Sequence, residues 1–308
     1  MFNYIFNNKP IIVYIIPFFL GCLTILSFQP FNFTIINFII FPFLFFIISY
    51  INKKSKNTYR KKPFLVNLFY VGYLFGIGFF FAGTYWISNS LTFDENFKGL
   101  IPFTLIIIPL VLGLFFGLGT LLSGRFIKFD IKSLFLFSAV LSLIDFFRAK
   151  IFTGFPWNLW AYSWSWFTEM IQILNPIGLF AFNLLSITIF LVPAIFFFKK
   201  FKYRGLIVIL FSLLLFSNYM YGNYILNNNE KQLKKYLDQD KFIDVKIISP
   251  NFDLKYYLSD SEIEERINKL IKFSEIDKNK KTLFIWPEGA LSGKYFFEIK
   301  KYKKIINE

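Results

Sequence analysis

The sequence predicts a polytopic α-helical membrane domain of about seven spans, followed by a smaller α/β domain. Two observations support the membrane domain. Hydrophobic residues make up 56 % of the 308 residues and aromatic residues 23 %, both above the average for soluble domains. Long apolar segments also follow one another as far as Gly222. The α/β domain is predicted because the chain beyond Gly222 is polar and mixed in charge. The predicted domains are therefore residues 1–222 and 223–308.

The apolar segments are long enough to be membrane spans. About 30 Å of hydrocarbon needs roughly 20 residues at 1.5 Å per residue, and only the fifth segment is on the short side. The first segment is too long and too weakly flanked for a cleaved signal peptide, so we expect it to be retained. The predicted spans are 11–28, 33–50, 64–88, 101–122, 133–148, 176–198 and 205–222.

The loops between these segments alternate in positive charge. If the N-terminus is cytoplasmic, the inside regions carry 14 Lys and Arg residues and the outside regions carry 3. The positive-inside rule therefore predicts a cytoplasmic N-terminus, and seven spans then place the C-terminal domain outside the cytoplasm. The same asymmetry accounts for the net charge of +15 without a nucleic-acid partner.

The lack of histidine limits the chemistry available to this chain. With no His and one cysteine, Cys22, the chain cannot form an internal disulfide, a Ser-His-Asp triad or a His-ligated zinc site. We therefore expect no metal and no cofactor. Any reaction must use carboxylates, lysines, tyrosines or hydroxyl groups, or groups supplied from elsewhere.

The polar C-terminal stretch predicts a strand, a helix and a second strand. Residues 242–249 and 282–286 are rich in β-branched and aromatic residues, which is typical of strands. Residues 261–273 have one apolar face, and Ser261 with Glu264 fits a capping box. This order predicts a βαβ unit with a parallel pair. Two strands alone form a thin sheet with exposed edges, so we expect the domain to be incomplete.

Glu288 follows the second predicted strand in the stretch TLFIWPEGALSG, residues 282–293. The carboxyl ends of parallel strands are where α/β proteins gather ligands and catalytic groups. Pro287 and Gly289 shape a turn there, and Trp286 is positioned to shield the carboxylate from water. The alternative is that a Pro-Glu-Gly turn simply ends the strand, and the residues alone favour that alternative.

The outside stretch GFPWNLWAYSW, residues 154–164, carries Trp157, Trp160, Tyr162 and Trp164. One interpretation is an aromatic belt at the membrane interface, and the other is a loop that holds lipid chains or caps a cleft. Gly154 and Pro156 favour a specific backbone shape over a plain helix.

Two further features inside the spans favour structural roles. Asp145 lies near the outer end of the fifth span, where pairing with Arg148 is the preferred interpretation. The FGIG and FGLG stretches, residues 75–78 and 116–119, indicate close helix packing rather than a phosphate loop.

These residues resemble the bacterial apolipoprotein N-acyltransferase family, a group of membrane-anchored nitrilase-like acyltransferases. The resemblance rests on GFPW with Tyr-Ser after it, on WPEGA, on FQPFNF at 28–33 and on ISPNFDLKYY at 248–257. In the last stretch Asn251 and Lys255 fit the family pattern, whereas Tyr256 stands where a Trp is usual and the spacing is shorter. The resemblance covers nearly the whole chain.

The resemblance implies a fold, a reaction and its participants. The C-terminal part would begin a nitrilase-like αββα sandwich outside the inner membrane. A cysteine thiolate would take an acyl chain from a phospholipid and pass it to the lipid-modified N-terminal cysteine of an apolipoprotein. Glu288 would be the base of a Glu-Lys-Cys triad. The proposed substrate-binding residues are Trp157, Tyr162, Lys255 and Tyr256.

The same resemblance places the Lys, the Cys and an eighth span beyond the residues given. We therefore expect this chain alone to be inactive. Two other functions stay open: a non-catalytic membrane anchor or assembly protein, and a small transporter. A transporter favours paired charges or broken helices at mid-membrane depth, and Asp145 lies near one end of its span.

Overall fold

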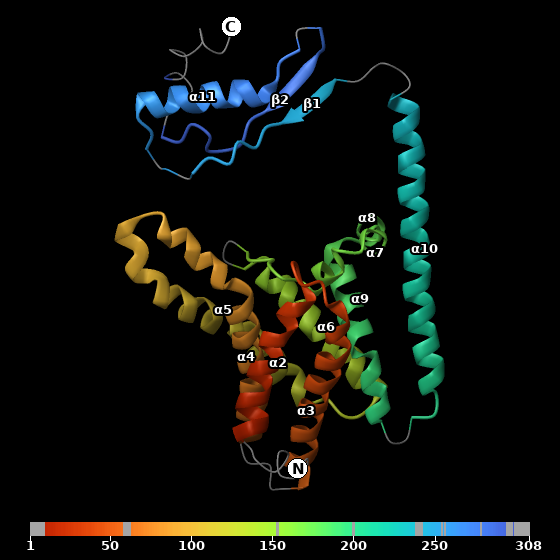
Figure 1. Cartoon of the computed structure of the whole chain (residues 1–308). Coiled ribbons are helices and arrows are strands. Elements are labelled where there is room, and N and C mark those ends of the chain that lie inside the picture. The colour runs from red at the N-terminus through yellow and green to blue at the C-terminus, as the bar shows by residue number, and fades with distance from the viewer. Residues whose placement is uncertain are drawn as a thin grey trace. The chain divides into compact units, whose positions relative to one another are not determined.

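The computed structural model describes residues 10–57, 63–151, 154–198, 201–237, 243–253, 255, 257–277, 279–293 and 298. The chain divides into two compact units, residues 1–228 and residues 229–308. The helices and strands are drawn in Figure 1. The first unit is helical and the second combines helix and sheet, as described separately below.

The first unit consists of helices joined by short irregular turns (Figure 1). Helix α4 packs against α2 and α5, and α9 packs against α3 and α6. The α-helices are α2 (Ile16–Thr24), α3 (Asn37–Asn57), α4 (Pro63–Thr84), α5 (Ile101–Gly124), α6 (Ile131–Arg148), α7 (Thr168–Ile171), α8 (Leu174–Ile177), α9 (Leu179–Leu191) and α10 (Arg204–Leu237). A π-helical turn, η1 (Ile11–Ile15), comes first, and the 3₁₀ segments are η2 (Ile25–Ser27), η3 (Thr34–Ile36), η4 (Tyr85–Thr92), η5 (Glu95–Leu100), η6 (Trp160–Trp164) and η7 (Val192–Phe197).

Within the described part of the chain, 5 helical segments are long and apolar enough to cross a membrane: Thr34–Lys54, Phe64–Thr92, Glu95–Gly124, Leu179–Phe197 and Arg204–Leu237. This result supports the predicted helical membrane domain. The first predicted span is the shorter apolar helix Ile11–Ser27. The fifth is α6, which carries Lys132, Asp145 and Arg148. The count of seven spans therefore stays a prediction.

Glycines allow the helices of the first unit to approach closely. A Cβ atom on Gly76 would lie 2.8 Å from the Cα atom of Gly113, and one on Gly78 would collide with the carbonyl oxygen of Phe18. In the second glycine pair, a Cβ on Gly117 would lie 2.7 Å from the ring of Phe69. The prediction that both stretches serve helix packing is confirmed.

The centre of the first unit is aromatic. Trp160 is fully buried, and its ring centroid lies 4.7 Å from that of Phe41 and 4.8 Å from that of Phe79. Trp164 is also buried and stacks on Phe190 at 5.5 Å. These two tryptophans are therefore core residues, and an interfacial belt does not explain them.

The second unit contains the predicted strand, helix and strand. They are β1 (Asp244–Ile247), α11 (Asp260–Ser274) and β2 (Thr282–Ile285). The strands pair in parallel, with Asp244 opposite Thr282 and Ile247 opposite Ile285. The predicted parallel βαβ unit is confirmed, although both strands are shorter than the apolar runs that indicated them.

The capping box of α11 differs from the prediction. Ser259 is the N-cap: its hydroxyl accepts from the backbone N–H of Glu262, and the Glu262 carboxylate accepts from the backbone N–H of Ser259. The expected Ser261–Glu264 pair was wrong because Ser-x-x-Glu occurs twice here, two residues apart. The Lys255 ammonium lies 2.5 Å from Glu262 Oε1, which adds an ion pair to the Ser259–Glu262 capping box.

The two faces of the sheet differ. Lys246 Nζ donates to the carbonyl oxygens of Ser274 and Glu275 at the end of α11, so helix and sheet are linked on that face. The other face is apolar, and its side chains are between 44 % and 75 % exposed within this structure. These side chains are Val245, Ile247, Leu283 and Ile285.

Candidate functional sites

Glu288 lies in a tight turn directly after β2. The backbone N–H of Ala290 donates to the carbonyl oxygen of Pro287 at 3.3 Å, which closes the turn. Gly289 takes a φ of +72°, a conformation that glycine adopts without strain. The turn presents Glu288 as an exposed side chain at the carboxyl end of the parallel pair.

A small hollow adjoins this turn. It has a volume of about 140 Å³ and lies between the loops that follow β1 and β2. Glu288 is part of its lining, and so is Asn251, which the sequence singled out. The other lining residues are Ser249, Pro250, Phe252, Asp253, Arg266, Pro287, Gly289 and Ala290. The second unit therefore combines a strand-end carboxylate with a pocket of its own.

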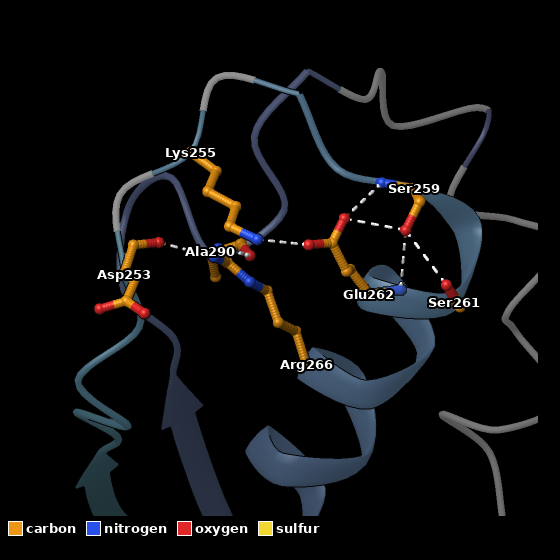
Figure 2. Close-up of polar contacts among 7 residues, drawn as sticks. All are labelled: Asp253, Lys255, Ser259, Ser261, Glu262, Arg266 and Ala290. Carbon is orange, nitrogen blue, oxygen red and sulfur yellow. Dashed lines mark hydrogen bonds and ion pairs between the residues drawn. The ribbon is translucent and has the colours of Figure 1, made fainter. Parts of the chain in front are cut away.

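Arg266 of α11 holds the two loops together. Its guanidinium donates to the carbonyl oxygen of Ala290 at 3.1 Å and to that of Asp253 at 2.6 Å, as Figure 2 shows. It also lies 4.7 Å from the centroid of the Phe252 ring, and the residue is buried. This residue was not predicted from the sequence. The available signal was a charged side chain on the apolar face of a helix, between Ile263 and Ile267.

Trp286 does not shield Glu288. Its indole nitrogen donates to the hydroxyl of Ser274 at 3.3 Å, and its ring packs with Ile248 and Leu270. Strand alternation explains the direction: Trp286 follows Ile285, whose side chain lies on the exposed face, so its own side chain turns toward α11.

Lys255 is engaged by a carboxylate other than that of Glu288. It pairs with Glu262, and both side chains belong to the polar cluster drawn in Figure 2. Hydrogen bonds from Lys255 and from the backbone and hydroxyl of Ser259 lower the pKa of Glu262 to about 2. Lys255 is not among the residues that line the pocket of Glu288. Tyr256 lies outside the described residues.

A larger cleft of about 750 Å³ lies in the first unit. It brings Trp157 and Tyr162 together, the two residues of the aromatic loop that the sequence proposed for substrate binding. Trp157 contacts Trp86, with ring centroids 5.0 Å apart. The remaining lining residues are Ile25, Phe28, Gln29, Pro30, Phe31, Ala82, Gly83, Tyr85, Pro156, Asn158 and Ser165.

Two of the segments that line this cleft are loops distant in sequence. The hydroxyl of Thr34 donates to the carbonyl oxygen of Ser163, and the indole of Trp166 donates to the Thr34 oxygen at 2.7 Å. These bonds join the FQPFNF turn to the aromatic loop. Both stretches are recognisable in the sequence, whereas Tyr85 and Trp86 belong to neither and were not predicted.

These features define a class of protein: a helical membrane protein with a separate α/β unit that carries a strand-end acid. A family model described as the apolipoprotein N-acyltransferase N-terminal domain matches residues 20–194, more than half of the chain. The chain belongs to the apolipoprotein N-acyltransferase family.

Individual relatives support this assignment. A protein named apolipoprotein N-acyltransferase from Rickettsia bellii is 30 % identical over 75 % of this chain and 45 % of its own length. Proteins of the same name from Allorhizobium ampelinum and Rhizobium etli are 25 % and 27 % identical, each over 88 % of this chain. Those matches cover 50 % and 51 % of the relatives, so the chain spans about half the length of the curated relatives it matches.

Proposed function

We propose that this chain takes part in N-acylation of apolipoproteins, with a membrane phospholipid as acyl donor and the amine of a diacylglyceryl-modified N-terminal cysteine as acceptor. The observation that carries the proposal is Glu288. It lies at the carboxyl end of a parallel strand pair and on the rim of a pocket, in a chain of the apolipoprotein N-acyltransferase family.

Glu288 is the proposed general base. It would accept the proton of a cysteine thiol, and the thiolate would attack the ester carbonyl of the phospholipid. Collapse of the tetrahedral intermediate releases a lysophospholipid, which takes up the proton, and leaves an acyl thioester. The acceptor amine then attacks the thioester, forms the amide and regenerates the thiol. A lysine near the carbonyl would stabilise the oxyanion in both steps.

The thiol of this mechanism is not assigned to any residue of this chain. Cys22 is the only cysteine in the sequence, and it lies in α2 among the apolar helices of the first unit. The lysine partner is likewise unassigned. We therefore expect acyl transfer only from a polypeptide that supplies both groups beside Glu288.

The aromatic cleft is the proposed site for an acyl chain of the lipid substrate. Its lining is mainly aromatic and aliphatic, which suits a hydrocarbon chain, and Trp157 and Tyr162 are its exposed aromatic members from the 154–164 loop. Lys255 and Tyr256 remain proposed contacts for a substrate. Lys255 is engaged by Glu262, so any such contact requires that pair to open.

The second unit is proposed as the beginning of a nitrilase-like αββα sandwich. Its support is the parallel pair with α11 on one face and four exposed apolar side chains on the other, a face that a further layer would cover. The family suggests a location in the inner membrane, and the charge asymmetry of the loops supports a cytoplasmic N-terminus with residues 223–308 in the periplasm.

A non-catalytic anchor is the alternative that one observation favours, namely a strand-end acid in a chain whose only thiol lies in α2. A small transporter has less support. The buried charges of α6, Asp145 and Arg148, pair with each other at 3.0 Å and bond to protein groups, so they do not present an open ion-binding site.

A chimera tests the catalytic proposal. Residues 1–293 are joined to the remaining part of the Rickettsia bellii relative, and transfer of a labelled acyl chain from phosphatidylethanolamine to a diacylglyceryl peptide is measured. The chimera is expected to be active and its Glu288→Gln variant to lose about 10²–10⁴-fold in rate, the range for removal of a general base. Glu264→Gln, an exposed carboxylate on α11, is the matched control. Equal rates for the chimera and its Glu288→Gln variant would show that Glu288 is not the base.

A further inference from the structure

A buried polar network lies at the end of α6. Arg148 and Asp145 are each 1 % exposed, and Arg148 Nη2 lies 3.0 Å from Asp145 Oδ1. Asn183 of α9 donates through Nδ2 to the second carboxylate oxygen of Asp145 at 2.9 Å. Placing a buried ion pair in an apolar unit is costly unless each group is well paired. Arg148 and Asn183 also make hydrogen bonds outside this trio of side chains.

Those remaining bonds all reach the aromatic loop. Arg148 Nη1 donates to the carbonyl oxygen of Phe155 at 2.6 Å and to that of Trp157 at 2.8 Å. The amide oxygen of Asn183 accepts from the backbone N–H of Ala161 at 3.2 Å. One guanidinium group therefore connects a carboxylate on its own helix with two backbone carbonyls of the loop.

The loop depends on such contacts because its backbone is irregular. Gly154 has a φ of +79° and Asn158 a φ of +53°, so residues 155–157 lie between two left-handed positions. Only one backbone hydrogen bond is described for these three residues, from the N–H of Phe155 to the carbonyl oxygen of Arg148 at 3.0 Å. Arg148 is the hydrogen-bond partner of the part-buried carbonyl oxygens at 155 and 157.

We propose that Arg148, oriented by Asp145 and Asn183, is the positioning residue that fixes the Trp157 wall of the aromatic cleft. Trp157 lines the cleft and contacts Trp86, and its carbonyl oxygen is bonded to the guanidinium. Moving that backbone displaces Trp157 in the cleft lining and so changes the width of the cleft. The network thereby sets which acyl chain the cleft accepts, a consequence that rests on the proposed lipid-binding function.

Lysine cannot replace this arginine. The guanidinium is planar and presents several N–H donors at fixed angles, so it reaches the carboxylate and both carbonyls at once, whereas an ammonium is a single point of charge. Arg148→Lys keeps the positive charge beside Asp145 and removes the planar set of N–H donors. If Arg148 only balances the charge of Asp145, this substitution leaves the loop in place. If Arg148 positions the loop, the substitution displaces it.

The test uses the whole 308-residue chain labelled with 5-fluorotryptophan in phosphatidylethanolamine–phosphatidylglycerol nanodiscs. Its 6 tryptophans give separate fluorine resonances, and Trp157→Phe assigns the one that matters. Arg148→Lys is expected to shift or split the Trp157 resonance and to leave that of Trp286 in place. Arg125→Lys, at an exposed arginine directly after α5, is expected to change neither. An unchanged Trp157 resonance in folded Arg148→Lys protein overturns the proposal.

A second variant and a second probe complete the test. If Arg148→Lys does not fold, Asn183→Ala, which leaves the ion pair, decides instead: a shifted Trp157 resonance supports the network and an unshifted one refutes it. Nanodiscs with doxyl-labelled phosphatidylcholine test the lipid site separately, by broadening of the Trp157 resonance in the unmodified chain. A shift in Arg148→Lys without such broadening supports positioning and contradicts the acyl-chain site.

Discussion

Arg266 organises the surroundings of Glu288 through two backbone contacts. It donates to carbonyl oxygens in the loops that follow β1 and β2, and the second of these is at Ala290, two residues from Glu288. Because these carbonyls take part in no ladder of the sheet, the guanidinium is their structural partner. The shape of the pocket at the strand ends therefore depends on one side chain of α11.

Removing this side chain is expected to loosen the Glu288 turn. Arg266→Ala leaves two carbonyl groups without their partner, and one unsatisfied buried group costs about 1–3 kcal/mol. Amide hydrogen exchange at residues 288–291 is expected to become faster, while exchange in the membrane helices stays the same. Lys272→Ala, on the exposed side of the same helix, is the control. Unchanged exchange in Arg266→Ala would show that the turn holds its shape without the arginine.

Glu262 predicts a pH effect on the start of α11. Its pKa is lowered from 4.5 to about 2 by the hydrogen bond from Lys255 and by those from Ser259. A lowered folded-state pKa contributes stability that is present above pH 4.5 and is lost as the pH falls toward about 2. Carbon-13 NMR titration of the Glu262 carboxyl is expected to show this low pKa, and Lys255→Gln is expected to raise it. A Glu262 that titrates near 4.5 in the unmodified chain contradicts the account.

At the scale of elements, packing by small residues determines how the first unit is assembled. Glycines of α4 lie against α2 and α5, with no room for a Cβ atom at Gly78 or Gly76. Apolar side chains gain no hydrophobic free energy by moving from lipid to a helix interface. Close packing between helices is therefore a main source of helix association in a membrane. The glycines of α4 are therefore expected to be sensitive to even the smallest substitution.

A pair of glycine substitutions checks this expectation. Gly78→Ala forces a methyl group toward the backbone of Phe18 and is expected to destabilise the unit by about 1–3 kcal/mol, as overpacking does. Gly205→Ala at the start of α10 has open space around it and is expected to be neutral or slightly stabilising. Thermal unfolding in detergent measures both. Equal melting temperatures for the two variants would contradict close packing at Gly78.

Some elements of the second unit could be predicted from the sequence, and others could not. The parallel pair could be predicted because strand, helix and strand occur in order with clear periodicity. The N-cap was misplaced by two residues because Ser259 and Ser261 satisfy the same pattern, and the structure places the capping hydrogen bonds at Ser259. The cleft could not be derived, since its lining combines three segments far apart in sequence, two of which meet through Thr34 and Ser163.

At the scale of the whole molecule, the distribution of charge predicts the orientation in the membrane. Basic residues are concentrated in alternate loops, and by the positive-inside rule this pattern predicts which loops stay in the cytoplasm. The comparison with relatives establishes the family, whereas orientation rests on charge alone. The predicted orientation is therefore independent of the family assignment and needs its own test.

Single cysteines test the orientation. In a Cys22→Ser background, Lys98→Cys is expected to react with a membrane-impermeant maleimide in intact bacterial spheroplasts, because its loop is predicted to lie outside. Lys128→Cys is expected to react only after the membrane is permeabilised, because its loop is predicted to lie inside. The opposite pattern contradicts the cytoplasmic N-terminus, and labelling of both positions in intact cells contradicts a single orientation.

The most direct test of the central claim, that Glu288 activates a thiol for acyl transfer, is the thioester step by itself. The chimera of residues 1–293 with the Rickettsia bellii relative is incubated with phosphatidylethanolamine and no acceptor, and its intact mass is followed over time. The account predicts one added acyl chain that hydroxylamine removes, with formation slowed about 10²–10⁴-fold in Glu288→Gln. Acylation of the Glu288→Gln chimera at the unmodified rate would contradict the account.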